Sequence, residues 1–237
     1  MNDASRDMPA RRPSCTHCMR PLKHCLCALI PSLDSNTRIL ILQHPAESRH
    51  ALNTARFAAL GLRNASLYTG LQFDEALWTD EAYRPALLFP GTDAQVLTCH
   101  LPAAHNHNEA SDHANTRDRC IRPVERPVLL VVLDGTWRQA RQLLAAHPGL
   151  ATLPRMTLPD GMTTQYRVRH ADDPRALSTI EAIAAALDVL DAPGSFRALL
   201  KPFEVLVARQ IAAMGQERYQ QHHVLRTGSR AQKQKAL

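Results

Sequence analysis

The 237-residue sequence is poor in aromatic side chains, which make up 5% of it. The apolar run at residues 128–133, as long as any in the sequence, is far too short to cross a bilayer. The N-terminal residues also lack the apolar segment of a signal peptide. We therefore expect a cytoplasmic protein that is neither secreted nor bound to a membrane. Apolar residues still make up 45% of the chain, enough for one domain without disulfide bonds.

Lysine is scarce, since only four of the 28 cationic side chains are lysines. The net charge of +6 is concentrated at the two ends. Residues 1–30 carry five basic and two acidic side chains, and residues 197–237 carry eight and two. Arginine makes planar, bidentate contacts with phosphate, although a GC-rich genome also favours arginine over lysine. The charge permits an anionic partner without naming one.

The sequence has no internal repeat and no glycine-rich phosphate loop of the G-x-G-x-x-G or G-x4-G-K-[ST] type. What it has instead is a cluster of thiols near the N-terminus, in the pattern C-x2-C-x6-C-x-C. The cluster consists of Cys15, Cys18, Cys25 and Cys27. Such spacing favours a structural Zn²⁺ site over a redox pair, and four thiol ligands leave no open position for catalysis. His17 and His24 are interleaved and can replace one cysteine.

Short apolar runs alternate with helical patterns along the rest of the chain. The expected strands are residues 38–43, 65–68, 87–89 and 128–133. The expected helices are residues 53–60, 136–147, 178–190 and 196–214. Ser178 followed by Glu181 is a capping box, which explains Glu181 without a catalytic role. This alternation predicts an α/β fold with a mainly parallel sheet.

Residues 100–126 do not fit this pattern, because they are polar, lack periodicity and exceed a normal connection. We interpret them as a flexible insertion, and their four histidines as a solvated loop rather than a metal site. Cys99 and Cys120 flank this stretch and look unrelated to the N-terminal cluster. The expected organisation is a zinc-binding segment at 1–30, a catalytic domain at 31–215 and a basic tail at 216–237.

Chemistry in open parallel sheets gathers at the carboxyl ends of the strands. Asp134 directly follows the clearest predicted strand and can act as a base or a ligand contact. Thr136 can cap the following helix, and Trp137 can offer a stacking face to a base. Alternatively, Asp134 is only a helix cap and Trp137 only a core residue. Gln43 and Asn53 can bind substrate or tie down the turn after the first strand.

These motifs together resemble the DTW-domain family. Asp134 to Trp137 matches its D-x-T-W signature, and the N-terminal cysteines match its C-x2-C-x6-C-x-C pattern. Further matches are Q-H-P-x-E at 43–47, N-T-x-R at 53–56, L-F-P at 88–90 and L-S-T-[LI]-E-A at 177–182. The motifs occur in family order across residues 15–190. The insertion at 100–126 departs from the compact family pattern.

The resemblance implies an enzyme that modifies tRNA. Family members of this kind transfer the 3-amino-3-carboxypropyl group of S-adenosylmethionine to N3 of a uridine and release 5′-methylthioadenosine. The fold is expected to be SPOUT-like, with a cofactor site that can be knotted. A SPOUT-like RNA methyltransferase and a non-catalytic, zinc-bearing RNA-binding protein remain alternatives. The oligomeric state and the uridine that is modified stay open.

The resemblance also implies site residues. The catalytic residues would be Asp134, Thr136 and Trp137, with Asp134 as a general base or as a group that positions the uridine. The residues expected to bind S-adenosylmethionine are Phe89, Pro90, Leu133, Gly135, Leu177, Ser178 and Thr179. The four cysteines would hold the zinc ion.

Overall fold

The computed structural model describes residues 13–48, 50, 52–97, 126–159, 161, 164 and 177–215. Its centre is a six-stranded sheet with the strand order β2-β1-β5-β3-β6-β4, in which every neighbouring pair is parallel. The strands are β1 (Arg38–Gln43), β2 (Ala65–Thr69), β3 (Arg84–Leu88), β4 (Gln95–Val96), β5 (Val128–Asp134) and β6 (Arg155–Thr157). The predicted α/β fold with a parallel sheet is confirmed.

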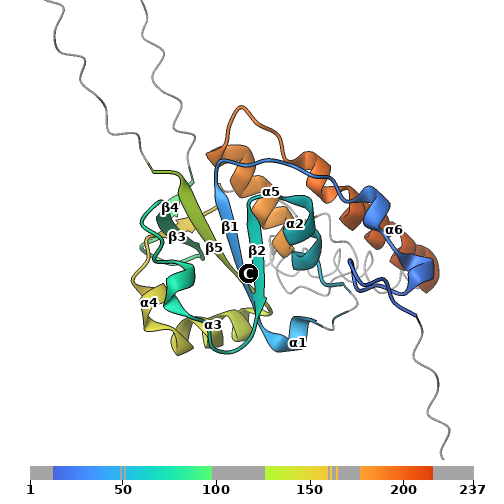
Figure 1. Ribbon diagram of the computed structural model, residues 1–237, viewed down its shortest axis with the longest axis horizontal. Coiled ribbons are helices and arrows are strands. Elements are labelled where there is room, and N and C mark those ends of the chain that lie inside the picture. The colour runs from blue at the N-terminus through green and yellow to red at the C-terminus, as the bar shows by residue number, and fades with distance from the viewer. Residues whose placement is uncertain are drawn as a thin grey trace, which may run out of the picture.

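The strand side chains alternate between two hydrophobic cores, as a sheet covered on both faces requires. Ile39, Ile41 and Leu130 belong to one core. It also contains side chains of α2 (Ala55–Gly61), α5 (Thr179–Leu190) and α6 (Lys201–Met214). Figure 1 shows these three helices together on one side of the sheet.

The opposite face of the sheet carries a smaller core. Leu40, Leu42, Leu87, Leu129 and Val131 pack there around the buried indole of Trp78. This face is covered by α3 (Trp137–Ala146) and α4 (Pro148–Ala151), which Figure 1 shows on the other side of the sheet. The remaining elements are η1 (Leu22–His24), η2 (Cys27–Leu29), α1 (Pro45–Ser48), η3 (Glu75–Leu77) and η4 (Arg197–Leu200).

The expected strands at 38–43, 65–68 and 128–133 correspond closely to β1, β2 and β5. Among the predicted boundaries that differ from the structure, two lie at prolines. The strand expected to include Phe89 ends at Leu88, one residue earlier and two before Pro90. The helix expected over 196–214 divides into η4 and α6, because Pro202 lacks the N–H of a helix interior and occupies the first turn of a new helix.

Some predictions lie outside the described residues. These include the interior of the insertion at 100–126, Cys99 and Cys120, and the tail at 216–237. The connection from β6 to α5 also lies mostly outside them, so the knotted cofactor site stays a prediction. Of the helices in the part of the chain that the structure describes, none has the length and apolarity needed to span a bilayer.

Candidate active site and cysteine cluster

Asp134 ends β5 and lies beside Gln43, its register partner at the end of β1. Both residues are buried. The Gln43 side chain donates from Nε2 to Oδ2 of Asp134 over 2.8 Å, and the Thr179 hydroxyl donates to Oδ1. Each carboxylate oxygen therefore accepts a hydrogen bond. Contacts from two elements fix the orientation of the acid at the edge of the sheet where the strands end, which we call the carboxyl edge.

Gln43 is itself held by a polar network. Its Nε2 also donates to Oδ1 of Asn53 over 3.1 Å, and its Oε1 accepts from the Thr69 hydroxyl over 3.2 Å. Oδ1 of Asn53 in turn accepts the backbone N–H of Arg56 at the start of α2. These hydrogen bonds connect Asp134, through Gln43, to β2 and to the start of α2, and they hold the carboxylate in place. The sequence suggested a substrate or turn role for Gln43, and its contact with Asp134 was missed.

The segment after Asp134 turns directly into α3. Thr136 caps this helix through a capping box, in which its Oγ1 accepts from the Gln139 backbone while its own N–H donates to Oε1 of Gln139 over 2.6 Å. A Cβ atom on Gly135 would lie only 3.0 Å from Cβ of Gln139, so glycine allows this close approach. Because Thr136 is the cap, the alternative that Asp134 caps the helix is wrong.

Trp137 lies at the start of α3 with 51% of its surface exposed. Its ring packs edge-to-face on Phe89, which follows β3, with ring centroids 5.8 Å apart and planes at 77°. The alternative that Trp137 is a core residue is therefore wrong. A half-exposed indole held by a second ring is a suitable stacking platform for a nucleobase.

The start of α5 is the third part of the chain that contributes to this site, after the ends of β1 and β5. The Ser178 backbone N–H and hydroxyl both donate to Oε2 of Glu181, over 2.8 and 2.7 Å, and Oε2 also accepts from Thr164. The predicted capping interaction is confirmed. By fixing the first turn of α5, it places Thr179 against Asp134.

The predicted site residues thus come from segments far apart in the sequence. Phe89 and Pro90 follow β3, whereas Leu133, Asp134 and Gly135 lie at the end of β5, its neighbour in the sheet. Leu177, Ser178 and Thr179 lead into α5. Side-chain contacts join predicted cofactor residues to predicted catalytic ones, as between Thr179 and Asp134 and between Phe89 and Trp137.

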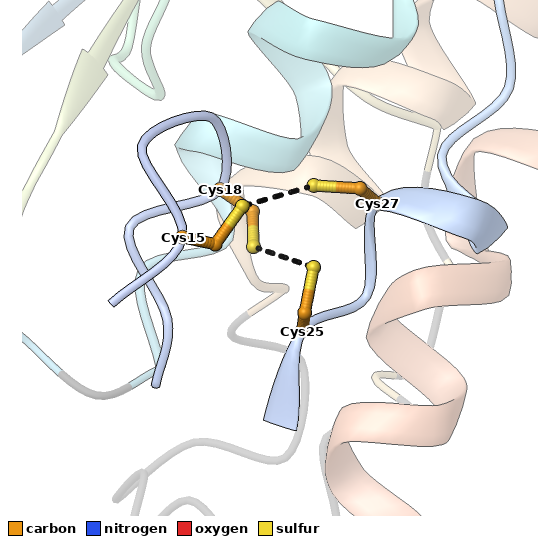
Figure 2. Close-up of side chains that lie close together, drawn as sticks. All are labelled: Cys15, Cys18, Cys25 and Cys27. Atoms are coloured by element: carbon orange, nitrogen blue, oxygen red, sulfur yellow. Dashed lines mark hydrogen bonds between the residues drawn. The ribbon is translucent and has the colours of Figure 1, made fainter. Parts of the chain in front are cut away.

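The four cysteines of the N-terminal segment converge on one point (Figure 2). All four Sγ atoms lie within 4.8 Å of one another. The Cys15–Cys27 and Cys18–Cys25 sulfur distances are 3.6 and 3.7 Å. A zinc ion with Zn–S bonds of about 2.3 Å in tetrahedral geometry requires sulfurs about 3.8 Å apart. The cluster therefore has the ligand type and spacing that zinc needs.

The thiols differ in their tendency to ionise. Hydrogen bonds from the backbone of Cys18 and then of His17 lower the pKa of the Cys15 thiol to about 6. Burial, together with hydrogen bonding to the neighbouring cysteines, raises the pKa of the Cys27 thiol to about 12. Four thiolates this close repel one another, so a bound cation would be needed to hold all four in the ionised form.

The cysteine segment packs against the domain rather than extending from it. Cys18 and Leu26 are buried in the same core as α2, α5 and α6, and η2 contacts α6. Nδ1 of His17 lies 3.5 Å from the Cys27 sulfur, so this histidine borders the cluster, whose four sulfurs already supply a full tetrahedral set. A metal here would stabilise the fold.

The fold and these sites define an α/β protein with an all-parallel sheet, a buried acid at its carboxyl edge and an N-terminal four-thiol cluster. The family model of the DTW domain matches residues 12–211, and the chain belongs to this family. The family membership predicted from the sequence motifs is thus confirmed.

Curated relatives agree with this assignment. The chain is 28% identical over 228 residues to tRNA-uridine aminocarboxypropyltransferase 2 of Macaca fascicularis, covering 92% of this chain and 70% of the relative. It is 31% identical over 218 residues to the protein of the same name in Drosophila melanogaster, covering 87% and 78%. The comparison with solved structures gave no match.

Proposed function

We propose that this protein transfers the 3-amino-3-carboxypropyl group of S-adenosylmethionine to N3 of a uridine in tRNA. The names of the curated relatives support the transfer of an aminocarboxypropyl group to tRNA uridine. The observation that carries the proposal for this chain is the buried Asp134 carboxylate, oriented by Gln43 and Thr179, three residues before the exposed Trp137 ring.

In the proposed reaction Asp134 removes the proton from uridine N3, because N3 is a poor nucleophile as long as it carries that proton. The carboxylate accepts this proton, and the N3 electron pair forms a bond to the donor's γ-carbon. The bond between that carbon and the sulfonium sulfur breaks, and its electron pair stays on sulfur in neutral 5′-methylthioadenosine. The sulfonium is already a good leaving group, so the protein's task is to align N3 with the carbon–sulfur bond.

Gln43 and Thr179 are positioning residues in this proposal. The two donors come from β1 and α5, and they fix the plane of the carboxylate. Thr136 acts one step further out, because its capping box sets where α3 and Trp137 begin.

The donor would bind along the carboxyl edge between the Phe89–Pro90 turn, the end of β5 at Leu133 and Gly135, and the start of α5 at Leu177 to Thr179. The residues present fit such a ligand. The Phe89–Trp137 pair offers an aromatic surface, and the backbone at Gly135 carries no side chain. Whether the pocket presents the γ-carbon or the methyl carbon to N3 would decide the product.

The identity of the by-product tests this proposal. Incubation of the protein with tRNA and S-adenosylmethionine should yield 5′-methylthioadenosine, measured by chromatography, in an amount that depends on tRNA. Formation of S-adenosylhomocysteine instead would identify a methyltransferase. Saturable tRNA binding without either product would identify a non-catalytic RNA-binding protein.

We further propose that Cys15, Cys18, Cys25 and Cys27 hold a structural zinc ion. The sulfur spacing supports zinc, and a complete four-thiol ligand set leaves no position at which the ion could activate a substrate. When bound, the ion would tie the segment around η1 and η2 to the core next to α6. We also propose domain boundaries at residues 30 and 215. They separate the zinc-binding segment from the catalytic domain, and the catalytic domain from the basic tail.

Substitution of Trp137 tests the stacking role. Trp137→Ala is expected to raise KM for tRNA by about 5- to 150-fold, because the loss of base–aromatic stacking costs about 1–3 kcal/mol. Trp137→Phe keeps an aromatic face and should restore most of the affinity. Steady-state kinetics with varied tRNA measure both effects, and an unchanged KM in the alanine variant would show that no base stacks on this ring.

Removal of residues 216–237 tests the role of the basic tail. The segment contains five basic residues and one acidic residue. We expect tRNA affinity to fall about tenfold or more, and the salt dependence to become shallower by about one log-log unit per lost phosphate contact. Affinity for S-adenosylmethionine should stay unchanged. Filter binding at several salt concentrations measures the effect, and equal tRNA affinity would contradict it.

A further inference from the structure

Arg155 is a cation beside the carboxyl end of β3 that the proposed reaction leaves without a role. It begins β6, and its register partner is Leu87 on β3. Side chains of register partners lie on the same face of a sheet, and Leu87 belongs to the core beneath α3 and α4. Arg155 therefore lies on the face that carries the Phe89–Trp137 aromatic pair, level with Leu87 near the end of the neighbouring strand β3.

The guanidinium of Arg155 reaches the turn that follows Phe89 and Pro90. A Cβ atom added to Gly91 would lie 2.9 Å from Nη1 and 3.4 Å from Cδ of Arg155. The same added atom would lie 2.9 Å from Oδ1 of Asp93. Glycine at position 91 thus leaves the space that the guanidinium occupies next to the proposed donor pocket.

The guanidinium is only partly satisfied. Nε is buried, and among the residues that the structure describes it has no hydrogen-bond partner. The ion pair of Nη1 with Asp93 is long at 3.6 Å, and the Asp93 side chain is mostly exposed. Asp93 approaches Nη1, whereas Nε lies on the other edge of the guanidinium fork. A buried N–H without a partner is unfavourable unless a ligand or a water molecule supplies the acceptor.

We propose that Arg155 binds the α-carboxylate of the aminocarboxypropyl donor, an inference that rests on the proposed function. The guanidinium fork matches a carboxylate in shape and charge. Three-quarters of the side chain is covered, so its charge is recessed behind the Gly91 turn and suits a small group inside the pocket. A tRNA phosphate, attached to a bulky backbone, would need a protruding cation.

This assignment gives the pocket a means of orienting the donor. When Arg155 binds the α-carboxylate, the aminocarboxypropyl arm of the donor is held at the end that lies away from the sulfonium. Asp134 lies on β5, two strands from β6, with its side chain toward α5 on the other face, so the donor would pass over the carboxyl edge to bring its sulfonium end to the uridine. Restraining the arm in this way would favour attack at the γ-carbon over attack at the methyl group, which carries no carboxylate.

The test compares two donors that differ only in this carboxylate. Calorimetry would measure the binding of S-adenosylmethionine and of its decarboxylated analogue to the wild-type protein and to Arg155→Gln. We expect Arg155→Gln to weaken S-adenosylmethionine by about 10- to 100-fold and to leave the analogue unchanged. Arg155→Lys, which keeps the charge but not the fork, should fall between. The matched control is Arg63→Gln. Arg63 also pairs loosely with an exposed aspartate, but it precedes β2 and so lies at the end of the sheet where the strands begin.

Gly91→Ala provides an independent variant that leaves Arg155 in place. Its methyl group would displace the guanidinium, so it too should weaken S-adenosylmethionine without affecting the decarboxylated analogue. Equal losses for both compounds, or no loss for either in Arg155→Gln, would overturn the assignment. A loss of tRNA affinity alone would identify a phosphate contact and would also overturn it. A wild-type protein that binds S-adenosylmethionine but forms no 5′-methylthioadenosine would contradict the proposed function separately.

Discussion

Asp134→Asn is expected to lower kcat for aminocarboxypropyl transfer by about 100- to 10,000-fold, the usual contribution of a positioned general base. The amide has nearly the shape of the carboxylate but cannot accept the N3 proton. With its oxygen toward Gln43, the new side chain still accepts that hydrogen bond, and its amide nitrogen can donate to the Thr179 hydroxyl. Binding of S-adenosylmethionine and of tRNA should therefore stay near the wild-type level. Single-turnover kinetics would separate the chemical step from binding.

Asp34→Asn is the matched control for this experiment. Asp34 is an exposed aspartate paired with Arg63 at 3.5 Å. It precedes β1 and so lies at the end of the sheet where the strands begin, away from the carboxyl edge. We expect wild-type turnover for this control. An Asp134→Asn protein that folds and turns over within a few-fold of the wild-type rate would rule out Asp134 as the base. Loss of donor binding in that variant would assign it a binding role instead.

Replacement of Cys18 by alanine is expected to remove the bound metal. The purified wild-type protein should contain one zinc ion per chain, and the variant almost none. Substitutions that only border a metal site cost about 10- to 100-fold in affinity, and loss of a ligand should cost at least as much. Because Cys18 is buried in the core that includes α6, we also expect a lower Tm.

Metal analysis and thermal unfolding, with and without a chelator, measure these effects. Cys99→Ser is the control, since this cysteine is outside the clustered motif and should leave the zinc content unchanged. Chelation should lower the Tm of the wild-type protein but not that of Cys18→Ala. A wild-type protein that is free of zinc after purification in zinc-containing buffer would contradict the structural metal site.

The strongest features of the fold could be predicted because each is encoded locally. The apolar runs of β1 and β5 are continuous, as buried parallel strands require. The capping residues Thr136 and Ser178 lie within three residues of their partners, so the sequence places both helix starts. The short strands β4 and β6 have two and three residues, too few for any period to appear, and they form by pairing, β6 with β3 and β4 with β6.

The site could be predicted only in part, because its contacts span the chain. Asp134 and Trp137 were found from their position after a strand and from the family motif. The hydrogen bond from Gln43 joins residues 91 positions apart, and that from Thr179 joins residues 45 apart. Arg155 had no sequence signal, since its place beside Gly91 depends on the pairing of β6 with β3. Such contacts follow from strand order, which local patterns do not specify.

Mass spectrometry of tRNA nucleosides tests the central claim most directly. Unmodified tRNA would be incubated with the wild-type protein and S-adenosylmethionine, digested to nucleosides and compared with a reaction that contains Asp134→Asn. We predict that the wild-type reaction gains a uridine carrying the 3-amino-3-carboxypropyl group on N3 and that the variant reaction does not. A methylated nucleoside, or no modified uridine in the wild-type reaction, would contradict the account.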